Sequence, residues 1–162
     1  MADPLHPIIE ARIDRATHRI IEDQVMPWLF LEAGPKFSVR RYDGSEIAFH
    51  RVAYDGAPRT AFWNGYILPY LEALATAEID HAVSLAAQRK ANLERLLPDV
   101  AALLLSAARK VLERMARVDQ GMRGDGGADD APLRPVASEL DHMRDFVSAR
   151  VSSELALRKR TS

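Results

Sequence analysis

Cysteine is absent from this chain of 162 residues. Its absence excludes disulfide bonds, thiolate catalysis and cysteine-based zinc or iron–sulfur sites. An excess of charge of one sign is also lacking, because 22 Lys and Arg residues stand against 23 Asp and Glu residues. No long apolar run occurs either, since the most apolar segment, Val100 to Ala108, is too short to span a bilayer. We therefore expect no membrane association and no strong general attraction to nucleic acid.

Targeting and catalytic signatures are equally scarce. The first residues, Met-Ala-Asp-Pro-Leu-His-Pro, contain neither a basic stretch nor an apolar core, so we expect no secretory signal and a cytoplasmic protein. The sequence has no nucleophile elbow and no glycine-rich phosphate loop after a strand. Its length and its apolar fraction of 48% are ordinary for one globular unit, so residues 1–162 are interpreted as a single helical domain.

Aromatic residues are scarce after Tyr70, where only Phe146 follows, and all the others lie between Trp28 and Tyr70. Aromatic rings are costly to leave in water, and they are frequent anchors in protein interfaces. One interpretation is that they attach a small unit to a helical body. The other is that part of the group forms an interface with a second copy or another protein, through Trp28, Phe30, Tyr42, Trp63, Tyr66 and Tyr70.

Apolar residues recur at helical spacing in most of the remaining sequence, which predicts a mainly α protein with a bundle of four or five helices. Pro98 is expected to occupy the first position of a helix, where its missing N–H costs nothing. The expected helices cover 7–26, about 60–97, 98–117 and 136–157. Between the last two, four of the eight glycines and several aspartates predict a flexible acidic loop over 120–135.

Residues 36–54 alternate in polarity around Asp43-Gly44, which predicts a β-hairpin inserted between the first two helices. A three-residue turn would pair Val39 with Phe49 and Arg41 with Ile47. This register would gather Phe37, Val39, Ile47 and Phe49 on one face. A lone hairpin is marginal in water, so we expect its apolar face to cover the helices or a partner.

Two Glu-x-x-His tetrapeptides lie within expected helices, one at Glu78 and His81 and the other at Glu139 and His142. In di-iron bundles such pairs supply part of the ligand set. Glu78 and His81 continue an apolar stripe toward the interior, whereas Glu139 and His142 are expected beside their stripe. An iron, manganese or zinc site is therefore kept as an alternative. The favoured interpretation is that these are helix-surface residues without a cofactor.

A basic stripe runs along the third expected helix at Arg109, Lys110, Arg114 and Arg117. Such a stripe is typical of nucleic-acid binding, but it is also typical of a solvated helix face. The near-neutral chain, Glu113 within the stripe and the nearby aspartates favour the second interpretation, so we do not expect nucleic acid as the partner.

The function that the sequence favours is non-catalytic: a protein–protein interaction or assembly module, either self-associating or a subunit of a larger complex. A metal-binding helical enzyme and a nucleic-acid-binding accessory subunit are the two alternatives.

Overall fold

The computed structural model describes residues 5–26, 37–40, 46–49, 67–122 and 136–161. Within these ranges the chain forms four long helices, α1 His6–Ile20, α3 Leu68–Arg89, α4 Leu93–Met122 and α5 Ala137–Thr161. A helical bundle is therefore confirmed for the described residues, and none of these helices combines the length and apolarity needed to cross a membrane.

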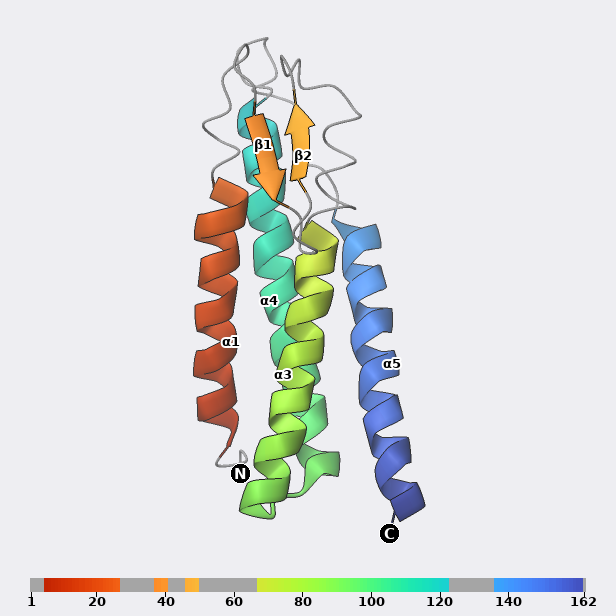
Figure 1. The fold of residues 1–162 in the computed structure, drawn as a ribbon. Coiled ribbons are helices and arrows are strands. Elements are labelled where there is room, and N and C mark those ends of the chain that lie inside the picture. Colours follow the sequence, from red (N-terminus) through yellow and green to blue (C-terminus); the bar gives the residue numbers. More distant parts are fainter. Residues whose placement is uncertain (1–4, 27–36, 41–45, 50–66, 123–135, 162) are drawn as a thin grey trace.

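The helices are arranged as a central pair with one helix on each flank (Figure 1). α3 and α4 run in opposite directions and pack on each other, while α1 and α5 lie on opposite sides of this pair and each contacts both of its members. In this view α3 lies in front of α4, and the flanking helices α1 and α5 each pack more extensively on α4 than on α3. α3 therefore has one face buried on α4 and an opposite face framed by α1 and α5.

The core is built from the apolar stripes that the four helices turn toward one another. Burial of this apolar surface is the main stabilising contribution to such a bundle. The one buried hydroxyl in α1, on Thr17, donates to the carbonyl oxygen of Ile13 at 2.7 Å, so it does not remain unpaired. The largest side chains with almost no exposed surface are Ile9, Ile13, Ile67, Leu71, Ile79, Leu93, Leu96, Leu97 and Leu112.

The first helix has a change of winding near its end. α1 passes into a π-helical turn, Ile21–Val25, which keeps Val25 fully buried. A wider turn moves later side chains around the helix axis, so the apolar spacing of Ile20 and Val25 fits the core better than in a regular α-helix. Together, the two segments cover nearly all of the helix expected over 7–26.

The boundary between α3 and α4 corrects the sequence-based prediction. α3 ends at Arg89, with Lys90 in a left-handed conformation at φ 54°, and α4 begins at Leu93. Asn92 caps α4 by accepting a hydrogen bond from the backbone N–H of Arg95 at 3.3 Å. Pro98 consequently lies inside α4 and not at its first position, because the helix starts five residues earlier.

The expectation of a β-hairpin inserted in the bundle is also corrected. Within the described ranges the bundle consists of helices alone, and neither described strand packs into it. Two strands of four residues, β1 Phe37–Arg40 and β2 Glu46–Phe49, pair only with each other, beyond the ends of α1 and α3 (Figure 1). Their register pairs Val39 with Ile47, not with Phe49. Each residue of β1 therefore pairs with a residue of β2 two positions earlier in the sequence than the polar pattern predicts.

The acidic glycine-rich segment expected over 120–135 is shorter than predicted at its start. Residues 120–122 belong to α4, which continues to Met122. The other residues of that segment, 123–135, lie outside the described part of the chain.

Candidate functional site

A hollow with a volume of about 680 Å³ lies between α1 and α3 and is called here the α1–α3 hollow. Three arginines of α1 and Tyr70 of α3 contribute its polar walls. Small and aliphatic side chains form the rest. The full lining is Arg12, Arg15, Ala16, Arg19, Ile20, Tyr70, Ala73, Leu74, Ala77 and Glu78.

Glu78 is the buried acid of this hollow, with only 4% of its surface exposed. It follows Leu71 and Ala75 on the stripe of α3 that packs into the bundle, as the helical spacing predicts. A buried carboxylate requires a charged or hydrogen-bonding partner. Arg12 of α1 supplies it, with Nε 2.8 Å from both carboxylate oxygens. The pair links α1 to α3 across 66 positions of sequence.

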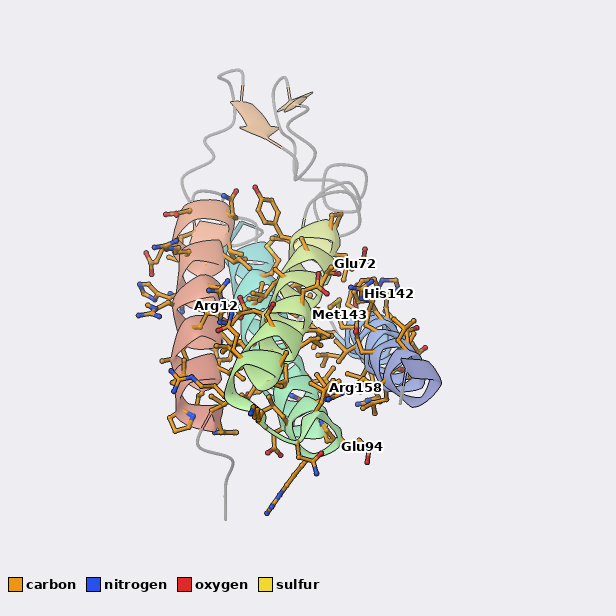
Figure 2. All side chains as sticks on the ribbon, turned by 60° about the horizontal axis from the view of Figure 1, so that its bottom comes forward. Arg12, Glu72, Glu94, His142, Met143 and Arg158 are labelled. Carbon is orange, nitrogen blue, oxygen red and sulfur yellow. The ribbon has the colours of Figure 1, made fainter. Side chains whose placement is uncertain are left out.

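The positive charge of the α1–α3 hollow exceeds its negative charge. Arg12 neutralises Glu78 through Nε, and its side chain remains 45% exposed. It lies between α1 and α3 (Figure 2). Arg15 and Arg19 are exposed and have no ion-pair partner among the described residues. Three guanidinium groups and one carboxylate thus leave the hollow with a net charge of about +2.

A second hollow, of about 370 Å³, lies on the other side of the same α3 face and is called the α3–α5 hollow. Its lining is Pro69, Glu72, Ala73, Thr76, Ala77 and Phe146. Ala73 and Ala77 line both hollows, so they form the ridge between them. The only charged residue of this second lining is the acid Glu72, whereas three arginines line the α1–α3 hollow.

Glu72 is paired across the α3–α5 contact. Its Oε1 atom lies 2.6 Å from Nε2 of His142, and both side chains are partly exposed (Figure 2). Farther along the same two helices, Nη2 of Arg150 donates to Oδ1 of Asp80 at 3.2 Å. These two pairs mark the height at which α5 packs against α3.

The two Glu-x-x-His tetrapeptides do not form one site. Glu78 is paired with Arg12 and His142 with Glu72, while His81 is half-buried on α3. Among the described residues, no group of three or more His, Asp or Glu side chains is placed to hold a metal ion.

Glu139 differs from its predicted position. It is buried, with 5% exposed, and not beside the apolar stripe of α5. Its Oε2 atom accepts a hydrogen bond from Oγ of Ser138 at 3.0 Å. α5 packs on both α3 and α4, so its contact surface is wider than one stripe of side chains.

The basic stripe of α4 is exposed along its length. Lys110, Arg114 and Arg117 line a small hollow of about 300 Å³ together with Ile21 and Glu113. Nε of Arg114 is directed at the sulfur of Met26 at 3.4 Å, and Arg109 lies 4.0 Å from Glu113. Two of the four cations are thus already engaged within the chain.

Of the six aromatic residues predicted to form an interface, five lie outside the described residues: Trp28, Phe30, Tyr42, Trp63 and Tyr66. The sixth, Tyr70, is half-buried and lines the α1–α3 hollow. Its neighbours there, Arg15 and Arg19, were not identified from the sequence. Their spacing from Arg12, three and seven residues along a helix, was the available signal because it places all three on one side.

Comparison of the chain with family models, with curated proteins and with solved structures gives no match.

Proposed function

We propose that this protein is a non-catalytic interaction module, and that it binds its partner through the face formed by α1, α3 and α5. The observation that carries the proposal is the pair of hollows on this face. They share the ridge of Ala73 and Ala77, and they are flanked by Tyr70 on one side and Phe146 on the other.

The chemistry of the face supports protein binding. Tyrosine, phenylalanine and arginine are enriched in interfaces, and the first hollow contains one tyrosine and three arginines. The alanine ridge carries no side chain large enough to keep a partner's backbone away. Enclosed pockets cover most of a small ligand, whereas these hollows have exposed residues in their walls, such as Arg15 and Ala77. An extended protein surface fits them better than a small substrate does.

Site-specific photocrosslinking tests the proposal. A photoreactive phenylalanine analogue replaces Ala77, which is exposed on the ridge, and the matched control carries it at Ala102, which is exposed on α4. We expect a crosslinked protein band in cells from position 77 and none from position 102. Equal crosslinking at both positions, or none at either, contradicts the proposed interface.

The nucleic-acid alternative is tested in parallel by measuring the binding of single-stranded RNA. Binding of single-stranded RNA at physiological salt, lost on Arg114→Glu, would favour a nucleic-acid role for the α4 stripe. We expect weak binding that disappears as salt rises, because contacts to phosphates release counterions.

A further inference from the structure

We propose that the partner on the α1–α3–α5 face is a second copy of this chain, related by a two-fold axis that runs parallel to α3. The inference rests on the proposed function and specifies its partner. A two-fold interface places the same patch of both copies together, so the face must complement itself.

The charged residues of the two hollows make the face complementary to itself under this rotation. Rotation by 180° about an axis along the alanine ridge places α1 of one copy in front of α5 of the other. The α1–α3 hollow, with a net charge of about +2, then faces the α3–α5 hollow, whose one charged lining residue is Glu72. The same complementarity occurs twice, once on each side of the axis.

The heights of individual residues match as well, because an axis parallel to α3 leaves height unchanged. Arg12 pairs with Glu78, and α1 runs antiparallel to α3, so each residue of α1 later than Arg12 lies level with an earlier residue of α3. With an equal rise of about 1.5 Å per residue in both helices, Arg15 is level with position 75 of α3 and Arg19 with position 71.

On the other flank, α5 runs parallel to α3, and His142 pairs with Glu72. Asp145, one turn after His142 and on the same side of α5, is therefore also level with position 75. Arg15 of one copy is thus placed at the height of Asp145 of the partner subunit. Arg19 is placed within about one residue of the height of Glu72 of the partner subunit.

The proposed contact between Arg15 and Asp145 of the partner subunit uses side chains that the described part of their own chain does not engage. Arg15 and Asp145 are both exposed, and neither has an ion-pair partner within the described ranges. Ala73 and Ala77 lie at the axis, where two copies of α3 approach each other most closely. Tyr70 and Phe146, both half-buried, lie on either side of that ridge and add apolar area.

Charge reversal across the interface gives the decisive experiment. Arg15→Glu alone brings two acids together at each contact, and Asp145→Arg alone brings two cations together. We expect each variant by itself to weaken the dimer about tenfold or more, measured by sedimentation velocity. Mixing the two variants restores an opposite-charge pair at both contacts, so we expect them to form a heterodimer as tight as the unmodified dimer. Lys110→Glu, on the exposed surface of α4, is the matched control and should leave the dimer unchanged.

The absence of cysteine allows a second, independent measurement. Ala73→Cys introduces a single thiol next to the proposed axis, and mild oxidation should then link two chains by one disulfide. Ala102→Cys on α4 serves as the control and should stay monomeric on a non-reducing gel.

A chain that is monomeric at high micromolar concentration and not linked through Ala73→Cys overturns the inference. So does a dimer that ignores both charge reversals. In either case, a crosslink from position 77 to a different protein would leave the proposed function standing, so the two failures are distinguishable.

Discussion

Nε of Arg12 lies 2.8 Å from both carboxylate oxygens of Glu78, so a half-exposed guanidinium neutralises an acid that water barely reaches. The pair connects α1 to α3 at the floor of the α1–α3 hollow. It is a structural element of the candidate site, because the position of α1 determines where its other arginines are presented.

Arg12→Ala should lower the free energy of unfolding by about 2 kcal/mol, because it leaves the carboxylate of Glu78 buried without its cation. Urea denaturation at a fixed protein concentration measures the change. Lys110→Ala, exposed on α4, is the control and should change the value by less than about 0.5 kcal/mol. In Arg12→Leu/Glu78→Leu, stability should recover to near that of the unmodified chain, because paired charges can be replaced by apolar side chains of similar size. If the double variant is no more stable than Arg12→Ala, the unpaired carboxylate of Glu78 is not the cause of the lost stability.

Lys90→Gly should raise the free energy of unfolding by about 0.5 to 1 kcal/mol. Lys90 ends α3 at φ 54°, a left-handed conformation that glycine adopts without the steric cost of a Cβ atom. Thermal unfolding followed by circular dichroism is the measurement. Lys90→Ala keeps the Cβ atom and should give no such gain; an equal gain in both variants would show that removal of the lysine charge is responsible.

Leu112→Ala should destabilise the bundle by about 2 to 5 kcal/mol, because Leu112 is fully buried in α4 and its loss leaves a cavity. Leu157→Ala removes the same atoms from a side chain that is 55% exposed, and should cost less than about 0.5 kcal/mol. Chemical denaturation of both variants gives the comparison. Similar losses at the two positions would mean that the C-terminal part of α5 is covered in solution.

The purified protein should contain no stoichiometric iron, manganese or zinc, because Glu78 and His142 are engaged by Arg12 and Glu72 instead of converging on one point. Elemental analysis by mass spectrometry measures this directly. His142→Ala should change the free energy of unfolding by less than about 1 kcal/mol, since its pair with Glu72 is partly exposed to water. One equivalent of metal that is lost on His81→Ala would restore the metal-site alternative.

Local periodicity in the sequence predicted helices where the four long helices lie, but not the boundary between α3 and α4. It also indicated that Glu78 faces the interior, so the favoured interpretation of Glu78 as a helix-surface residue was wrong. The apolar spacing on α3 continues through Leu71, Ala75 and Ile79, and a carboxylate on that stripe is carried inward with it. The boundary predicted at Pro98 was wrong, because α4 continues through this proline although its missing N–H leaves the carbonyl group of Glu94 without the regular helical hydrogen bond. The cap that starts α4 is Asn92, whose preference for this position was readable in the sequence.

Contacts between helices were not predictable from the sequence. Arg12 finds Glu78 at a separation of 66 residues, and His142 finds Glu72 at 70. Nothing in the local spacing of either residue specifies its partner, which depends on the height at which two helices pack. For the same reason, the arginine side of α1 could be recognised as a stripe, but its placement above a hollow of α3 could not.

α4 packs on each of the other three long helices, whereas α1 and α5 each flank the α3–α4 pair from one side. Opening of α1 or α5 exposes one side of the bundle and leaves the remaining three helices together. Release of α4 removes the common contact of all of them. The backbone amides of α4 should therefore exchange with deuterium only through global unfolding, while those of α1 and α5 exchange faster through separate partial openings.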